Sequence, residues 1–288
     1  MMLYVLYRIG YFVVNLFPLK VSYCIASFLA DLCCLISYRD RRYVVRNLAT
    51  ISGRQHDKRA LRNMARELYR NFAKYLVDFF RSARIDEEYV KKMVKVEGEK
   101  NIDSVLAGGK GVILMSAHIG NWELGGSVIS ILGYPISAVV LSHKNKKVNE
   151  FFRKRRLAGG LTPIEMGASL KACYKSLMSG KVLALLGDRD FNKSGLMLDF
   201  FGRKTLFPKG PSVFSYRLNV PIIPTLMVRQ PDDTFKIVFE EPMYADSSKK
   251  EEDAVFELGA KCAGRIESYI QRYPTQWYVF KDMWNKDE

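Results

Sequence analysis

The chain has 288 residues, of which 48% are hydrophobic, and this length suits one large α/β domain with a well-buried core. Its formal net charge is +15, with 45 Lys and Arg against 30 Asp and Glu, so we expect an anionic partner. No RNA- or DNA-binding signature accompanies this charge. We therefore predict no nucleic-acid partner and favour an anionic membrane surface or a phosphorylated substrate.

The N-terminal segment is unusually apolar but interrupted by charge. Two apolar runs, 1–17 and 21–37, contain Arg8 and Asp31 respectively, and neither reaches about 18 residues free of charge. No small-residue cleavage site of a signal peptide follows them. The next segment, RDRRYVVR at 39–46, is strongly basic, and an apolar helix with a basic flank predicts a membrane anchor. The anchor would either span the bilayer or lie on it, and the alternative is a helical hairpin packed on the domain.

The rest of the chain alternates between helical and strand patterns. Residues 56–84 predict one long helix, a charged linker follows at 86–100, and we expect the sheet to begin after this linker. Short apolar runs predict strands at 111–117, 136–141, 182–187, 222–228 and 235–239. Helical patterns separate most of them, at 122–132, about 146–158, 168–179, about 208–218 and 251–272. The alternation predicts an α/β sandwich with a mixed, largely parallel sheet. We divide the chain into an anchor at 1–46 and one α/β domain at 47–288.

The cysteines have no CxxC spacing. Three lie in the N-terminal apolar segment and two in predicted helices: Cys24, Cys33, Cys34, Cys173 and Cys262. We predict that all are free, buried, small hydrophobic residues in a reducing compartment, and not disulfide partners or metal ligands.

The segment GVILMSAHIGNWELGG, at 111–126, is the most informative stretch of the chain. Its apolar run predicts a buried strand that ends at His118, and ligands of open α/β sheets bind at the C-terminal ends of strands. Gly120 and Asn121 predict a turn, and Glu123 opens the next helix. On a continuous helix Glu123 would lie roughly 140° from His118, so the two side chains can meet only across that turn. A structural core histidine is the alternative, but the turn and the polar break in an apolar run favour a functional site.

The sequence HIGNWE has the form His-x4-Glu and resembles the signature of glycerolipid acyltransferases. It most resembles the bacterial lipid A biosynthesis (late, or secondary) acyltransferase family, which also includes the phosphatidylinositol mannoside acyltransferases. Further segments agree in order: GDRD at 187–190, DFFGRK at 199–204, FPKGPSVFSYRLNVPIIP at 207–224 and RYPTQWYVFKDMW at 272–284. The likeness covers nearly the whole chain and implies the glycerolipid-acyltransferase-like α/β fold.

The resemblance also implies an activity. It predicts a membrane-associated enzyme that moves a fatty acyl chain from an acyl-carrier-protein thioester to a hydroxyl of a lipid A precursor, without a cofactor or an acyl-enzyme. Its place would be the inner membrane, with the catalytic domain facing the cytoplasm. One alternative is an acyl-CoA-dependent enzyme acting on another glycolipid, phospholipid or aminolipid. The alternative from another class is a non-catalytic membrane- or nucleic-acid-binding protein.

Acyl transfer to a hydroxyl requires a base and a group that stabilises the oxyanion. His118 is the candidate base, and a carboxylate on its other ring nitrogen would fix the tautomer. Glu123 is the carboxylate that the wider motif favours. Asp188 matches the acidic partner of the mannoside acyltransferase branch, and it follows a predicted strand, so it should emerge at the same sheet edge as His118. The sequence leaves this choice open.

Basic residues after the second predicted strand are candidate substrate contacts. His143 stands where the family usually has an arginine, which is a departure from its pattern. A Lys and Arg cluster follows, including Arg156, and it would hold phosphopantetheine, an acidic carrier protein or lipid phosphates. The alternative for any single residue is an exposed basic helix.

The remaining candidates lie near Asp188 and in a predicted acceptor-side loop. Arg189 and Asp190 follow Asp188 directly, Phe201 and Lys209 belong to the loop, and we expect Gly210 to begin a helix whose free N–H groups suit an anion. We assign substrate binding to these residues and to Asn121. His118 with Asp188 and Asp190 would suggest a metal phosphoesterase, but that site needs more ligands and the chain has 3 histidines, so we predict no metal.

Overall fold

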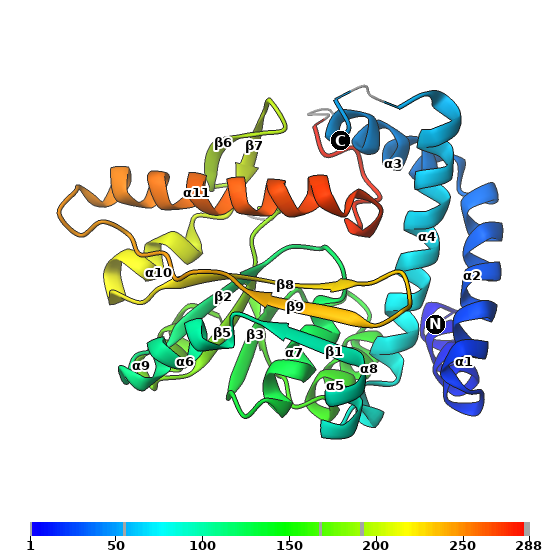
Figure 1. Cartoon of the computed structure of the whole chain (residues 1–288), viewed down its shortest axis with the longest axis horizontal. Coiled ribbons are helices and arrows are strands. Elements are labelled where there is room, and N and C mark those ends of the chain that lie inside the picture. The colour runs from blue at the N-terminus through cyan, green and yellow to red at the C-terminus, as the bar shows by residue number, and fades with distance from the viewer. Residues whose placement is uncertain (1, 54–55, 167–168, 191–192, 285–288) are drawn as a thin grey trace.

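The computed structural model describes residues 2–53, 56–166, 169–190 and 193–284 (Figure 1). Within them a mixed sheet of 7 strands has the order β1-β9-β8-β2-β5-β3-β4. Its strands are β1 (Val94–Glu97), β2 (Val112–Ser116), β3 (Ile136–Val140), β4 (Thr162–Glu165), β5 (Val182–Leu186), β8 (Ile222–Arg229) and β9 (Phe235–Phe239). β2, β3, β4, β5 and β8 run parallel to one another, while β9 is antiparallel to β8 and pairs in parallel with β1. The prediction of a mixed, largely parallel sheet is confirmed.

Helices cover both faces of this sheet. They are α5 (Glu87–Met93), α6 (Glu99–Ala107), α7 (Trp122–Ile131), α8 (Lys146–Ala158), α9 (Ser169–Met178), α10 (Gly210–Leu218) and α11 (Glu251–Arg272). Alternate residues of β2 face opposite sides: Val112 and Leu114 pack in a cluster with α6 and α7, and Ile113 and Met115 in a cluster with α9 and α11. In Figure 1, α11 lies along one side of the sheet and α5, α6 and α7 along the other.

Some elements were not predicted. The expectation that the sheet begins after the linker at 86–100 is wrong, because β1 lies inside it, between α5 and α6. β1 is a short edge strand, and its four residues give too little alternating pattern to stand out. β4 and an antiparallel pair, β6 (Leu196–Phe200) with β7 (Arg203–Phe207), were also missed. Residues 1 and 168, with which two predicted elements began, lie outside the described residues.

The N-terminal helices lie beside the sheet and not within its layers. They are α1 (Met2–Leu16), α2 (Leu19–Ile36), α3 (Tyr38–Ile51) and α4 (Lys58–Phe80). α2 runs along α4 (Figure 1), and Asp31 of α2 accepts hydrogen bonds of 2.5–2.8 Å from Arg66 and Arg70 of α4. The predicted helix at 56–84 corresponds to α4. Its N-terminus is capped by the Asp57 side chain, which accepts a 2.7 Å hydrogen bond from the Ala60 N–H.

The outer face of α1 and α2 is apolar and exposed. α2 is the one helix of the described residues whose length and composition would allow it to cross a membrane, and 22% of it is buried. Large apolar side chains exposed on the two helices are Leu3, Val5, Leu6, Ile9, Phe12, Leu16, Val21, Phe28, Leu29, Leu32, Leu35 and Ile36. The segment is thus a helical pair packed on the domain that keeps an apolar outer surface.

The cysteines are all free. Cys34, Cys173 and Cys262 are buried, as predicted. The prediction was wrong for Cys24 and Cys33, which are exposed because they lie on the outward side of α2.

Candidate active site

The loop after β2 carries His118 and is fastened to its surroundings. Gly120 has a φ of +63°, and a Cβ atom at this position would collide with the carbonyl oxygen of Met227. The backbone N–H of Asn121 donates to that same oxygen at 2.7 Å, and the N–H of Gly120 donates to the Gln276 carbonyl at 2.9 Å. The predicted turn after His118 is confirmed, and β8 and the C-terminal segment hold it in place.

The imidazole of His118 contacts Asp188. Its Nδ1 lies 2.8 Å from Asp188 Oδ1. β2 and β5 are parallel neighbours, and Ser116 of β2 pairs with Leu186 of β5. His118 lies two residues after Ser116, and Asp188 lies two residues after Leu186. The sheet register therefore places both side chains at the same edge.

Asp188 is fully buried, and its second oxygen is also occupied. Oδ2 accepts from the Trp277 Nε1–H at 3.0 Å and from the His118 backbone N–H at 3.2 Å. Burial raises the pKa of Asp188, but the charge of His118 and its hydrogen bond lower it more, so the pKa lies below its ordinary value. An ionised Asp188 favours the proton on Nδ1 of His118, which leaves Nε2 free to accept another.

Glu123, the carboxylate of the His-x4-Glu motif, has a different partner. Arg156 of α8 holds it with Nε 3.1 Å from both carboxylate oxygens and Nη2 2.6 Å from Oε1. The side chains are 6% and 11% exposed for Glu123 and Arg156, so this is a buried, bidentate ion pair. Burial lowers the pKa of Arg156, but Glu123 raises it more, and the net shift is upward. Glu123 therefore links α7 to α8 and does not orient His118.

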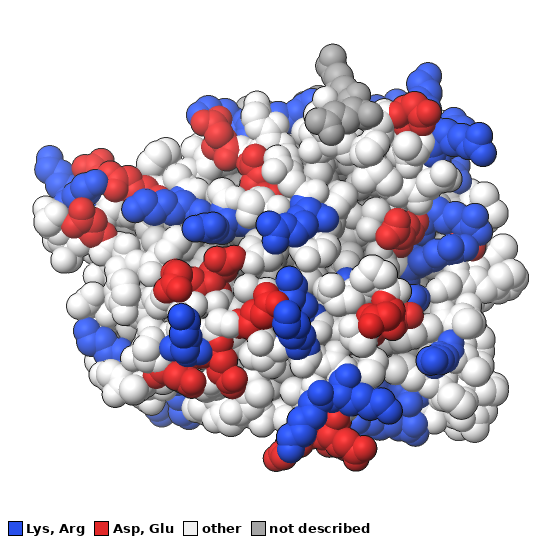
Figure 2. Space-filling view, viewed as in Figure 1, with Lys and Arg blue, Asp and Glu red and all other residues white. Residues whose placement is uncertain are grey.

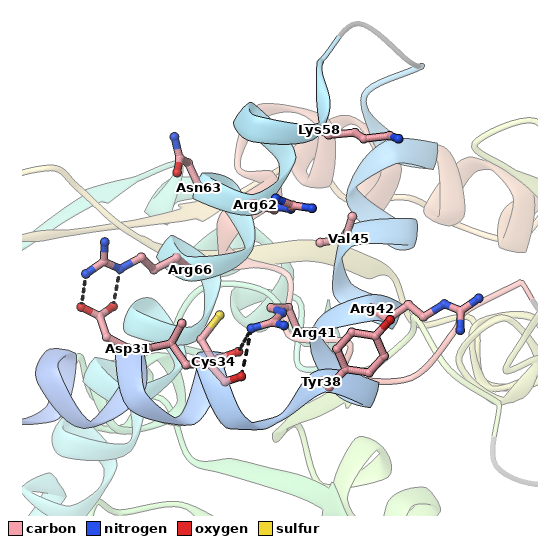
Figure 3. Close-up of a pocket in the computed structure, with 11 residues that line it drawn as sticks. Asp31, Cys34, Tyr38, Arg41, Arg42, Val45, Lys58, Arg62, Asn63 and Arg66 are labelled. Carbon is pink, nitrogen blue, oxygen red and sulfur yellow. Dashed lines mark hydrogen bonds and ion pairs between the residues drawn. The ribbon is translucent and has the colours of Figure 1, made fainter.

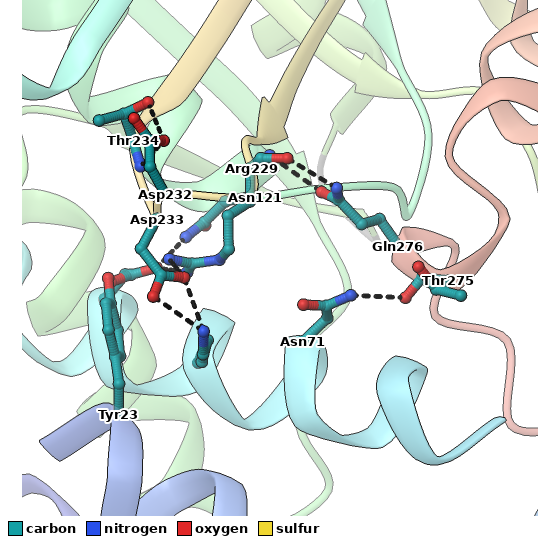
Figure 4. A network of polar contacts seen from close by, with 11 residues as sticks. Tyr23, Asn71, Asn121, Arg229, Asp232, Asp233, Thr234, Thr275 and Gln276 are labelled. Atoms are coloured by element: carbon teal, nitrogen blue, oxygen red, sulfur yellow. Dashed lines mark hydrogen bonds and ion pairs between the residues drawn. The ribbon is translucent and has the colours of Figure 1, made fainter. Parts of the chain in front are cut away.

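A third carboxylate, Asp78 of α4, is buried and contacts the loop; its partners Tyr23, Asn121 and Arg229 are labelled in Figure 4. It accepts hydrogen bonds from the hydroxyl of Tyr23 at 2.5 Å, from Asn121 Nδ2 at 2.8 Å and from Arg229. The Asn121 side-chain oxygen meanwhile caps α7 through the N–H of Leu124 at 3.1 Å. One buried group thus connects α2, the end of β8 and the loop that carries His118.

A cavity of about 780 Å³ lies in front of His118. Its volume falls within the roughly 300–1,000 Å³ of small-molecule sites. Most of its wall is apolar; the sheet, α4 and α7 form about half of it, and the loop after β3, the segment that begins α10 and Tyr7 of α1 also contribute. Gly125 and Gly126 of α7 line it without side chains. The cavity is therefore mainly apolar, and His118 is one of its polar lining residues.

The family model of bacterial lipid A biosynthesis acyltransferases matches residues 1–286. This chain belongs to that family. A phosphatidylinositol mannoside acyltransferase of Mycolicibacterium smegmatis is 24% identical over 247 residues, which are 84% of this chain and 79% of the relative. Another, of Mycobacterium tuberculosis, is 23% identical over 161 residues, 54% of this chain and 51% of the relative. The lipid A biosynthesis palmitoleoyltransferase of Escherichia coli K12 is 23% identical over 225 residues, 77% of this chain and 72% of the relative. The predicted family relationship is confirmed, and the protein is an acyltransferase.

The cavity of this acyltransferase collects most of the predicted substrate contacts. The candidates that line it are His143, Arg156, Arg189, Asp190, Lys209 and Gly210. α10 begins at Gly210, as expected. The His143 ring lies 4.6 Å from that of Phe152, and burial, with the charge of Arg156, lowers the pKa of His143. A histidine with a lowered pKa thus stands where the resemblance predicts an arginine.

Two predicted contacts lie outside the cavity. Asn121 is 1% exposed, and its amide is used by α7 and Asp78. Phe201 packs its ring against Trp284 and donates its backbone N–H to Glu267 Oε2 at 2.8 Å. The Asn121 side chain therefore positions the loop, because both of its polar atoms are hydrogen-bonded to Asp78 and α7. Phe201 packs beside α11.

Three residues of the site were not assigned from the sequence. Trp277 lies in the segment RYPTQWYVFKDMW and received no assigned role, but its indole N–H donates to Asp188. Asp78 and Arg229 had signals that could have been used: an acid inside the apolar run Val-Asp-Phe-Phe, and a cation at the C-terminal end of an apolar strand. Among the described residues, no group of three or more His, Cys, Asp or Glu could hold a metal ion.

Proposed function

We propose that this acyltransferase moves a fatty acyl chain from an acyl-carrier-protein thioester to a hydroxyl of a lipid A precursor, with His118 as the general base. The observation that supports this most is His118 itself, which has Asp188 on Nδ1 and faces an apolar cavity of about 780 Å³. The cavity would hold the acyl chain of the donor. The acceptor follows from the family and from the name of the Escherichia coli relative. A glycolipid of the mannoside type is the alternative that the mycobacterial relatives favour.

The step balances without a cofactor. His118 Nε2 takes the proton of the acceptor hydroxyl while its oxygen attacks the thioester carbonyl. The tetrahedral intermediate then collapses, the C–O ester bond is kept, and the C–S bond breaks. The leaving thiolate takes the proton back from Nε2, so the histidine ends as it began. Asp188 stabilises the imidazolium that exists between these transfers.

The other polar groups of the cavity would bind and orient the substrates. Lys209 and the first N–H groups of α10 suit the oxyanion or a phosphate. Arg189 lies with Nε 4.0 Å from Asp188 and donates Nη2 to the Tyr278 carbonyl at 2.6 Å, so its charge is fixed beside the dyad. The ion pair of Glu123 and Arg156 would keep one wall rigid.

The donor is proposed from the basic surface around α8. Lys144, Lys146, Lys147 and Arg153 are exposed near the cavity residue His143 and suit an acidic carrier protein. Acyl-CoA, which also carries phosphates, is the alternative donor. A non-catalytic binding protein is no longer favoured, because the chain belongs to a family of enzymes.

We also propose that the protein lies on the cytoplasmic face of the inner membrane without crossing it. The inner sides of α1 and α2 are committed to the domain: Tyr23 binds Asp78, and Asp31 binds two arginines of α4. A crossing α2 would lose these contacts. Lying in the interface, the two helices keep them and bury their apolar outer face.

The test is reconstitution of the purified full-length protein with a lipid A precursor and either acyl carrier protein or CoA thioesters, with products identified by mass spectrometry. We expect an O-acylated precursor from the carrier thioester, and none from His118→Ala. Turnover of the CoA thioester alone, or acylation of a mannoside and not of the precursor, would replace the proposed donor or acceptor. Release of free fatty acid without formation of an acylated lipid would contradict the proposed acyl transfer.

A further inference from the structure

A second cavity, of about 1160 Å³, lies where α2, α3 and α4 meet (Figure 3). It shares no lining residue with the cavity in front of His118. We call it the α2–α4 pocket, and its cationic residues are Arg41, Arg42, Lys58, Arg62 and Arg66. Asp31 is the one carboxylate among its lining residues.

The charges of the α2–α4 pocket are only partly used within the protein. Arg66 holds Asp31 through two hydrogen bonds, and Arg41 donates to the carbonyls of Cys34 and Leu35 at 2.7 and 3.1 Å. These contacts fix the C-terminal end of α2 and are the dashed lines in Figure 3. Among the described residues, the remaining three cations have no ion-pair partner: Arg42, Lys58 and Arg62. The pocket therefore presents three available positive charges to an outside anion.

The rim of the α2–α4 pocket is apolar. Leu35 and Tyr38 line the pocket and are 68% and 67% exposed, and Ile36, next to Leu35 in the chain, is 80% exposed, so these side chains continue the exposed outer face of α2. On the face shown in Figure 2, by contrast, basic and acidic side chains are interspersed. Cations immediately beside an exposed apolar face match the boundary between phosphate headgroups and acyl chains of a bilayer.

We propose that the α2–α4 pocket binds the phosphate headgroup of an anionic membrane phospholipid. Arg42, Lys58 and Arg62 would contact the phosphate, while Leu35, Ile36 and Tyr38 insert beside the acyl chains of the same lipid. A carrier protein would satisfy the charges but leave these apolar side chains in water, so the lipid fits better. The site is separate from the catalytic cavity, and it rests on the proposed membrane association.

The experiment is vesicle flotation of the full-length protein. The vesicles contain phosphatidylcholine alone or phosphatidylcholine with phosphatidylglycerol. The pocket variant is Arg42→Gln/Lys58→Gln/Arg62→Gln, and the matched control is Lys92→Gln/Lys100→Gln/Lys181→Gln, which removes the same charge from exposed positions elsewhere. We expect the pocket variant to bind anionic vesicles roughly 100-fold more weakly than the wild type, and the control at most about threefold more weakly. Both should bind phosphatidylcholine vesicles like the wild type, because the apolar face is unchanged.

Several outcomes would overturn the proposal. If both variants lose binding to anionic vesicles equally, only the diffuse charge of the protein matters. If the pocket variant loses no binding, the pocket does not bind the headgroup. Unchanged vesicle binding with weaker binding of acyl carrier protein would assign the pocket to the carrier. If the pocket variant binds vesicles normally but is no longer stabilised against heat by inorganic phosphate, the pocket is a site for a soluble anion. A wild-type protein that floats with neither vesicle would defeat the membrane association itself, which is a separate failure.

Discussion

Two carboxylates lie on either side of the His118 loop, and their partners differ in one decisive property. Asp188 pairs with an imidazole, whose other ring nitrogen can accept a proton, and His118 lines the cavity. Glu123 pairs with a guanidinium, which stays protonated and uses its donors on the carboxylate. The first pair is suited to moving a proton, and the second to holding two helices together. Motif spacing alone cannot distinguish them.

The largest expected effect is the loss of the proton acceptor. His118→Ala should lower kcat by about 10²–10⁴-fold, because general-base catalysis contributes that much. Since this variant also leaves Asp188 without its ring partner, His118→Gln is the companion, as its amide can still donate toward Asp188. Both should lose activity while circular dichroism stays unchanged. Activity within threefold of wild type in either variant would remove His118 from the mechanism.

Asp188→Asn should follow, with a fall in kcat of about 10²-fold or more and little change in KM. Asp199→Asn, at an exposed position, is the matched control and should not change kcat.

The wild type and Asp188→Asn also offer a stability test. The folded pKa of Asp188 lies below its unfolded value, which is about 3.9, so its charge stabilises the fold above that pH. This contribution is lost as the pH falls through the folded pKa.

The gap in melting temperature between wild type and Asp188→Asn should therefore be constant above about pH 5 and narrow below it. Thermal melts across the acid range measure this gap. A gap that widens toward low pH would mean that Asp188 is not held ionised in the folded protein.

Glu123→Gln sharpens the contrast from the other side. Removing one partner of a buried ion pair costs about 3–5 kcal/mol of folding free energy, so we expect a large drop in the denaturation midpoint. Arg156→Gln should do the same, and the double variant should cost less than the sum of the two. The exposed pair Glu150 and Arg153 on α8 is the matched control, and its double Gln variant should be neutral. A kcat loss for Glu123→Gln as large as that for Asp188→Asn would return the relay role to Glu123.

The sequence made part of this contrast predictable. An apolar run ending at His118 and another ending before Asp188 indicate two buried parallel strands, and their C-terminal ends share one edge. That β2 and β5 are neighbours in matching register is a tertiary property, which no spacing along the chain contains. The motif spacing therefore favours Glu123, five residues away, whereas the other candidate, Asp188, contacts His118 from 70 residues away.

The roles of other residues of the site could not be predicted from the sequence for a related reason. Asp78, Arg229 and Tyr23 come from α4, β8 and α2, and only the packed structure brings them to the same point behind the loop. Phe201 was assigned to substrate binding because it lies in a segment that resembles the acceptor-side loop of the family. Its neighbour Phe200 and Trp284 instead give its ring a packing site.

The smallest effect concerns the contact between α2 and the loop that carries His118. Tyr23→Phe removes the hydroxyl that donates to Asp78 and leaves Arg229 and Asn121 in place. A buried hydrogen bond to a charged group contributes about 1.5–3 kcal/mol, and two remaining donors should limit the loss to about 1 kcal/mol. Urea unfolding measures this, with Tyr174→Phe as control, because that tyrosine is half exposed. Turnover should fall by less than about threefold, since Asp78 still holds Asn121. A kcat loss comparable to that of Asp188→Asn would show that α2 tunes His118 through Asp78, and the division between a proton-moving and a holding side would have to be abandoned.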